Sequence, residues 1–309
     1  MTVLGASTVI RQSPQGGSHG AVFLVDIEQG RLAHVLDWKA PGVDWAAPGG
    51  GRGLRGMAFD GQRVFIAAAD ALFEFTPGLE LQATYRSPYL ANGHDVVCFE
   101  RRLYMASTGY DSILGFDLEK NRFDWGLRVH EGERGMNGVP FDPYSSLGPP
   151  PGNHLGLNSL WCDARGMFIS GAGTLGLLHF DVRTIERLVS LPRGVQNARP
   201  WRDGVLFNDT EANVARFITP DSNRVFQVPR YPPEQLDLSA AGDQQRSRQG
   251  FARGLCVVDE STFAVGSSPA TITLHNLDTM KTTRSINFSS DPCHTIHSLA
   301  VWPYKVSFG

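Results

Sequence analysis

The sequence predicts an all-β fold, a six-bladed β-propeller with four-stranded blades, and three observations support this prediction. First, one phrase recurs: a polar residue, a small residue, an apolar run, and an aromatic ten positions after the start. Second, short apolar segments break at Gly, Asp or Pro, and none shows a helical period over helical length. Third, the two chain ends carry complementary parts of one further unit. A repeat of roughly 40 residues built from four short strands is typical of propeller blades.

The recurring phrase marks the innermost and second strands of successive blades. It runs from Arg55 to Phe65, from His94 to Tyr104, from Asn158 to Phe168 and from Arg253 to Phe263. A turn and a further aromatic-rich strand follow each of these aromatics. The complete units predicted in this way span about 53–86, 94–127, 157–191, 197–228 and 252–288. Among them, the unit at 197–228 matches the phrase most weakly.

The two chain ends supply the sixth blade. The segment "HSLAVW" at 297–302 has the pattern of an opening strand, but no blade follows it. The N-terminal segments "TVLGAST", "AVFLVDIEQG" and "RLAHVLDW" have the pattern of a blade that lacks its opening strand. Pairing the two ends closes the ring and removes exposed sheet edges. We therefore expect one propeller domain over residues 1–309.

Composition and charge limit the classes of partner. The chain has 34 glycines and 19 prolines with 19% charged residues, which fits many tight turns between strands. A net charge of −3 without a basic stripe argues against nucleic-acid binding. No apolar run is long enough to span a membrane, and the N-terminus lacks the pattern of a signal peptide. The sequence therefore predicts no membrane partner and a cytoplasmic location.

The cysteines are expected to be free. Three of the four, Cys98, Cys162 and Cys256, fall on the same kind of strand shortly after the polar head of the repeat. No pair that includes them or Cys293 has the spacing of a metal site. We expect small apolar core residues rather than a disulfide framework.

In strand order the chain resembles the six-bladed propellers of the NHL-repeat and SMP-30/strictosidine-synthase-like groups. The resemblance covers nearly the whole chain at the level of layout. SMP-30-like lactonases hold a divalent metal on the axis through a Glu, an Asn and an Asp. The resemblance implies that Asn158 would stand for that Asn, whereas no Glu occupies an equivalent strand head in this sequence.

Polar residues at the heads of the innermost strands form the candidate site. In a propeller these strands line the central channel, so residues at equivalent heads are expected to converge. Buried polar groups must bond one another, bond water or hold a ligand. In register, the heads are Arg55, His94, Asn158, Asn197 or Arg199, Arg253 and His297.

These residue types favour a small anionic or polar ligand. The planar fork of arginine suits a carboxylate, sulfate or phosphate. Histidine can transfer a proton near neutral pH. If the protein is an enzyme, we expect His94 or His297 to act as acid or base, while Arg55 and Arg253 stabilise negative charge. Hydrolase, lyase or group-transfer chemistry would then be favoured over redox chemistry.

The remaining polar residues at or beside the strand heads are expected either to contact the ligand or to point away from it. Asn158, Asn197 and Arg199 are predicted ligand contacts. Asp95 follows His94 directly and would point to the opposite face of a regular strand, so it is not an expected partner of that imidazole.

Further contacts are expected at the rim of the site. Tyr110, in the turn "STGYDS", is not explained by turn chemistry, and Trp45 lies in a proline- and glycine-rich segment. The connections at 128–156 and 229–251 are too long for plain turns, which is typical of lids or disordered segments. We expect both to lie over the face that carries the polar heads.

Two alternatives to this interpretation stay open. One is a non-catalytic propeller that binds a protein or peptide through the long connections and Trp45. The other is a metal-dependent enzyme, either lactonase-like or a multi-histidine iron oxygenase that resembles the carotenoid-cleaving oxygenases. Candidate metal ligands are His94, His154 and His297, and a divalent metal is the one cofactor considered. The sequence does not indicate an oligomeric state.

Overall fold

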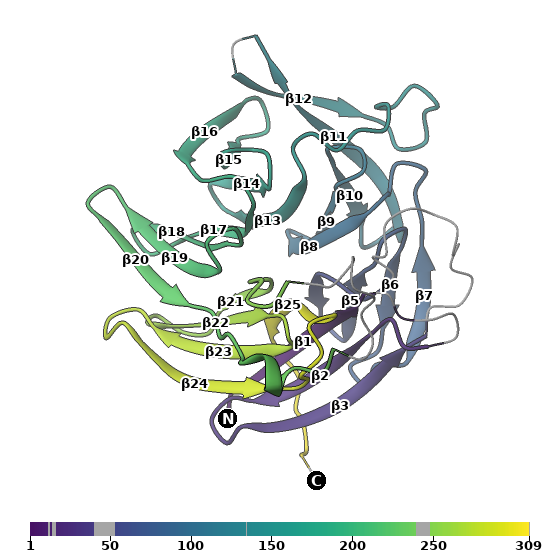
Figure 1. Cartoon of the computed structure of the whole chain (residues 1–309). Helices are drawn as coiled ribbons and strands as arrows, with labels where there is room; N and C mark the ends of the chain where they lie inside the picture. Colours follow the sequence, from purple (N-terminus) through teal and green to yellow (C-terminus); the bar gives the residue numbers. More distant parts are fainter. Residues whose placement is uncertain (12, 14–16, 40–52, 134, 239–247, 309) are drawn as a thin grey trace. The chain divides into compact units, whose positions relative to one another are not determined.

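The computed structural model describes residues 1–11, 13, 17–39, 53–133, 135–238 and 248–308 (Figure 1). Within these ranges the chain forms six antiparallel sheets, and the all-β, six-bladed β-propeller is confirmed. The chain divides into two compact units, residues 1–55 with 208–309 and residues 56–207. We call them the terminal unit and the central unit. A single domain over residues 1–309 stays a prediction.

Three sheets follow the predicted four-stranded units closely. The first contains β4 (Met57–Asp60), β5 (Arg63–Ala67), β6 (Leu72–Phe75) and β7 (Leu81–Tyr85). Another contains β13 (Leu157–Asp163), β14 (Gly166–Gly171), β15 (Gly176–Phe180) and β16 (Ile185–Ser190). The third contains β21 (Leu255–Val257), β22 (Thr262–Ser267), β23 (Thr271–Asn276) and β24 (Lys281–Asn287).

The weakly matching unit also forms a four-stranded sheet. It contains β17 (Val195–Trp201), β18 (Gly204–Asp209), β19 (Val214–Thr219) and β20 (Ser222–Gln227). A short 3₁₀ helix, η1 (Pro233–Gln235), lies in the long connection that follows. Residues 239–247 of that connection lie outside the described residues.

The chain ends form the remaining blade as predicted. Its strands, in spatial order, are β25 (His294–Val301), β1 (Val3–Ile10), β2 (Gly20–Asp26) and β3 (Arg31–Trp38). The strand β25 pairs antiparallel with β1, from Leu4 opposite Val301 to Ile10 opposite His294. Figure 1 shows yellow β25 beside purple β1. Closure by strands from both termini is therefore confirmed.

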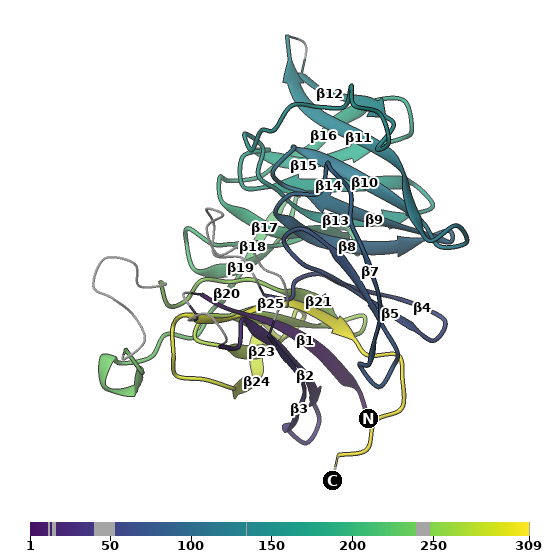
Figure 2. The ribbon, with the colours of Figure 1, turned by 90° about the vertical axis from the view of Figure 1, so that its right-hand side faces the viewer.

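The blade at 93–141 has five strands instead of four. It contains β8 (Gly93–Phe99), β9 (Arg102–Ser107), β10 (Ser112–Asp117), β11 (Arg122–Gly132) and β12 (Gly135–Phe141). The expectation of a loop over 128–156 was wrong for its first half, because β11 continues to Gly132 and returns as β12, its pairing partner (Figure 2). Gly135 at the turn has a φ of 121°, which glycine adopts without strain. Only 142–156 remains a connection.

Apolar side chains pack between neighbouring sheets. One cluster joins the sheets of β4–β7 and β8–β12 and includes Phe65, Leu103 and Phe116, all fully buried. In the terminal unit another cluster includes Leu4, Ile272 and Ile296. Burial of such large apolar side chains is the main favourable contribution to folding.

None of the four cysteines forms a disulfide, as expected. Cys256 and Cys293 are buried, while Cys98 and Cys162 are half-buried and pack against the apolar clusters of the central unit. Burial, together with the nearby carboxylates of Asp163 and Asp95, raises the pKa of Cys162 to about 12. A thiol in this state is a poor nucleophile.

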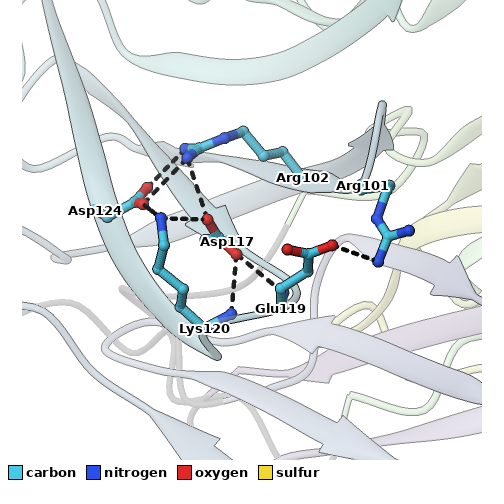
Figure 3. Close-up of polar contacts among 6 residues, drawn as sticks. All are labelled: Arg101, Arg102, Asp117, Glu119, Lys120 and Asp124. Atoms are coloured by element: carbon cyan, nitrogen blue, oxygen red, sulfur yellow. Dashed lines mark hydrogen bonds and ion pairs between the residues drawn. The ribbon is translucent and has the colours of Figure 1, made fainter.

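Ion pairs join three strands of the five-stranded blade, as Figure 3 shows. Arg102 on β9 donates two hydrogen bonds to Asp124 on β11, at 2.7 and 3.1 Å. Lys120 in the β10–β11 turn bonds both Asp117, at 2.8 Å, and Asp124, at 3.1 Å. A second pair, Arg101 with Glu119, lies exposed beside this network.

The network predicts a pH-dependent contribution to stability. Burial alone would raise the pKa of Asp124, but hydrogen bonds from Arg102 and Lys120 hold the pKa below its usual value. A carboxyl with a lowered pKa in the folded state adds stability above its ordinary pKa, and that stability is lost as the pH falls through the folded value. We expect Asp124→Asn to reduce the free energy of unfolding by about 1 kcal/mol at neutral pH and by less in acid. Urea unfolding at both pH values measures this difference.

The matched control is Glu119→Gln, which removes a carboxylate from the exposed pair with Arg101. It should leave the free energy of unfolding nearly unchanged. A loss in Asp124→Asn that is equal at neutral and acid pH would contradict the electrostatic origin.

Candidate functional site

Three of the predicted head residues lie where the strand pairing is irregular. The register of β8 with β9 shifts between Gly93 and Val96, which brackets His94 and Asp95. The register of β13 with β14 skips Asn158. The register of β25 with β1 passes from Ile296 to Ser298, which leaves His297 as the extra residue. Such bulges leave a residue outside the ladder and redirect its side chain, and they are over-represented beside active sites.

The bulge changes the expectation for Asp95. Strict alternation of side chains does not apply between Gly93 and Val96, because the register shifts there. The Asp95 carboxylate accepts the backbone N–H groups of Val96 and Leu160, each at 3.0 Å. Leu160 belongs to β13, so this carboxylate joins the inner strands of two neighbouring blades.

Asp95 also has a shifted acidity. Burial raises the pKa of the Asp95 carboxyl to about 6, against the opposing effects of its Leu160 hydrogen bond and the nearby charge of Arg199. Arg199, on β17, lies with its guanidinium 5.2 Å from the centre of the Trp161 ring. The central unit thus brings Asp95 and Arg199 together, and sequence reasoning had set Asp95 aside.

Close approach of the backbone explains the glycine after Arg55. The N–H of Gly56 donates to the His94 carbonyl at 3.0 Å. A Cβ at position 56 would lie 2.6 Å from the Val96 nitrogen and 2.9 Å from an Asp95 carboxylate oxygen. Packing in the central unit therefore requires glycine at position 56.

Asn158 has an architectural contact and one free acceptor. It is 2% exposed, and its amide donates to the Val195 carbonyl at 2.9 Å. Its side-chain oxygen is buried and has no hydrogen-bond partner among the residues that the structure describes. Asn197 has a φ of 55°, a conformation that asparagine tolerates better than most residues.

The terminal unit gathers four arginines, which we call the arginine cluster: Arg11, Arg55, Arg248 and Arg253. Three of their guanidinium carbons lie over the Phe251 ring, at 5.8 Å for Arg11, 5.6 Å for Arg248 and 4.8 Å for Arg253. A ring face attracts cations within about 6 Å. Two of the members, Arg55 and Arg253, were predicted site residues. Arg11, Arg248 and Phe251 were not, because they lie outside the recurring phrase.

Burial lowers the pKa values of two members of the arginine cluster. Arg55 is 5% exposed, and burial, followed by the charge of Arg11, lowers the pKa of Arg55 to about 10. Burial, followed by the charges of Arg11 and Arg55, lowers the pKa of Arg253 to about 9. These guanidinium groups therefore keep their positive charge at neutral pH while losing part of their hydration.

The described residues supply no carboxylate for three of these cations. Arg11, Arg248 and Arg253 have no ion pair with any carboxylate in the part of the chain that the structure describes. The Nε of Arg253 is buried there without a hydrogen-bond partner. Arg248 donates to the carbonyl of Thr210. Within the part of the chain that the structure describes, no carboxylate pairs with Arg11, Arg248 or Arg253.

His297 belongs to the same unit as the arginine cluster. It is 4% exposed at the bulge of β25. His94 is also buried, but it belongs to the central unit. The convergence of all the predicted heads on one axis stays a prediction.

The remaining predicted residues fall elsewhere. Tyr110 and His154 line one cavity of the central unit, beside the connection 142–156. Trp45 lies outside the described residues. Among the described residues, no group of three or more His, Cys, Asp or Glu side chains could hold a metal ion. The described residues therefore supply no set of metal ligands for the metal-dependent alternatives.

Comparisons with known proteins show the fold alone. No protein-family model matches the sequence, and no curated protein matches it. A chain of the nidogen/laminin complex superposes with a TM-score of 0.60 at 12% identity, covering 97% of each chain. A protein of unknown function from Bacteroides caccae gives 0.57 at 10% identity, covering 97% of this chain and 98% of that one. The designed protein Ika8 gives 0.50 at 10% identity, covering 95% and 90%.

No helix within the described ranges has the length and apolar character needed to cross a membrane.

The environment of Asp95 predicts an unusual titration. Because burial raises the pKa of this carboxyl, its ¹³C chemical shift should titrate with a midpoint near pH 6. The signal is assigned by its loss in Asp95→Asn. A midpoint at the ordinary carboxyl value, about 4, would contradict the desolvated position of Asp95.

Proposed function

We propose that this propeller binds a small anionic molecule, bearing a carboxylate, phosphate or sulfate group, through the arginine cluster. The observation that supports this most directly is Arg253, a desolvated guanidinium with no carboxylate partner among the described residues. Burial of an unpaired charge is costly unless another group compensates it. A bound anion would supply that compensation.

The chemistry of the cluster fits this ligand class. Guanidinium groups bind planar or tetrahedral oxyanions through two parallel hydrogen bonds, and they stay protonated at neutral pH even with lowered pKa values. Three of them lie within 6 Å of the centre of the Phe251 ring. Partial desolvation strengthens their attraction for an anion, since the effective dielectric constant is lower than in water.

Acid–base chemistry is the second candidate function, and the raised pKa of Asp95 favours it. A carboxyl that titrates near pH 6 is suited to proton transfer at neutral pH. His94 adjoins it in sequence, and His297 occupies the equivalent bulge in the terminal unit. We propose these two histidines and Asp95 as the acid–base candidates of a hydrolase, lyase or transferase.

The finer resemblance to SMP-30-like lactonases is a weaker proposal. It would assign Asn158 as a metal ligand, and the buried side-chain oxygen of Asn158 is the one feature that favours this role. The alternative of a protein-binding propeller depends on Trp45 and the long connections, and no observation in the described ranges favours it.

Anion binding can be tested by calorimetry with inorganic phosphate, sulfate and citrate as probes. We expect at least one probe to bind wild-type protein at neutral pH. Arg253→Gln should weaken that binding about tenfold or more, because a charge-assisted hydrogen bond contributes roughly 1.5–3 kcal/mol. Binding should also weaken as the pH rises through about 9, where Arg253 loses its proton.

The matched control is Arg230→Gln, since Arg230 is an exposed arginine of the same unit. It should leave the dissociation constant unchanged. Equal affinities in Arg253→Gln and wild type, or no binding of any probe, would contradict the proposal.

A further inference from the structure

A cavity of about 620 Å³ opens in the central unit, and it shares no residue with the arginine cluster. Its walls come from the β9–β10 turn, strand β11, the connection 150–155, the β14–β15 turn and the connection from β16 to β17. A volume of this size is within the range of sites for small organic molecules.

Backbone hydrogen bonds hold the walls of the cavity in place. The Asp111 carboxylate accepts the N–H groups of His154, Leu155 and Gly156, at 2.6, 3.1 and 3.2 Å. Gly152 forms a parallel bridge with Tyr110. The connection 150–156 is therefore fixed against the β9–β10 turn, and the Asp111 carboxylate serves this purpose.

The connection that carries Arg193 is fixed in the same way. Leu191 donates its N–H to the Leu175 carbonyl at 3.1 Å, and Gly194 donates to the Ala172 carbonyl at 2.8 Å. Both acceptors belong to the neighbourhood of the β14–β15 turn. These backbone hydrogen bonds fix the walls of the cavity, which reduces the entropic cost of binding.

Two arginines line the cavity without carboxylate partners. Arg128 on β11 and Arg193 form no ion pair within the described part of the chain. By contrast, Arg63, Arg102 and Arg165 of the same unit each pair with a carboxylate. The Nδ1 atom of His130, beside Arg128 on β11, is buried with no hydrogen-bond partner among the described residues.

Apolar groups complete the lining. Leu155, Leu175, Pro150 and Pro151 supply carbon surface, whereas Val129 is fully buried in the core. Among the described lining residues, Glu131 is the one carboxylate besides Asp111, and it is exposed. The lining therefore combines two cations and a half-buried histidine with an apolar wall.

We infer that this cavity binds a small organic anion, whose carboxylate or phosphate meets Arg128 and Arg193 while its carbon skeleton packs against Leu155 and Leu175. An inorganic ion alone would leave the apolar wall uncovered, and a neutral ligand would leave both guanidinium groups unpaired. Tyr110 and His130 then supply further hydrogen bonds to the ligand.

The experiment is a titration of methyl-labelled full-length protein with phenyl phosphate, benzoate, inorganic phosphate and benzyl alcohol. Methyl signals of Leu155 and Leu175 report on this cavity and not on the arginine cluster. We expect saturable shifts with phenyl phosphate or benzoate and weaker or no binding of inorganic phosphate and benzyl alcohol. Which of the two organic anions binds more tightly distinguishes a phosphate ligand from a carboxylate ligand.

Arg128→Gln and Arg193→Gln should each weaken binding of the organic anion by about tenfold, whereas Arg183→Gln, at an exposed turn of the same unit, should not. Methyl spectra of each variant without ligand verify its fold. The inference is overturned if neither organic anion shifts these methyl signals at millimolar concentration, if benzyl alcohol binds as well as they do, or if both arginine variants bind like wild type. Failure of the arginine cluster to bind anions would leave this result unaffected.

Discussion

The inner strands of the blades are joined by side chains that bond the backbone of the next blade, and the site depends on this constraint. In the central unit, the Asp95 carboxylate accepts the N–H of Leu160, and the Asn158 amide donates to the Val195 carbonyl. In the terminal unit, Ser7 on β1, the second strand of its blade, donates to the carbonyl of Arg55. An inner strand has one edge without a strand partner, so its backbone groups must find other partners or stay unsatisfied.

This constraint determines which polar residues remain for a ligand. Asp95, which the sequence analysis set aside, and the amide of Asn158, a predicted ligand contact, are both engaged in joining blades. The guanidinium groups of Arg11 and Arg253 have no such architectural bond among the described residues. Among the described residues, the positive charge of Arg11 and Arg253 is therefore the feature that the architecture does not explain, and it is the basis of the proposed function.

The sequence predicted the blades well because each blade repeats the same local pattern. The phrase that opens at Arg55, His94 and Arg253 located the inner strands, and the complementary chain ends located the closing blade. The hairpin of β11 and β12 was missed, because the segment was interpreted from its glycines and prolines as a loop. The apolar residues Val129 and Met136, which the structure buries, were the sequence signal that could have indicated strands.

The site was less predictable because it depends on contacts between distant segments. Arg11 reaches the cluster only through the pairing of β1 with β25, and Phe251 lies in a connection without a repeat. The bulges at His94, Asn158 and His297 could not be predicted from the sequence, since a register shift is set by the partner strand and not by the local sequence. The residue types at the strand heads could be read from the sequence, whereas the directions in which their side chains point could not.

The most direct test of the central claim is anomalous diffraction from a crystal soaked in selenate, a sulfate analogue whose selenium can be located unambiguously. The account predicts an ordered selenate within hydrogen-bond distance of the Arg253 guanidinium, with a second guanidinium of the arginine cluster also in contact. A crystal in which Arg253 instead pairs with a carboxylate of the protein, with no selenate beside it, would contradict the account.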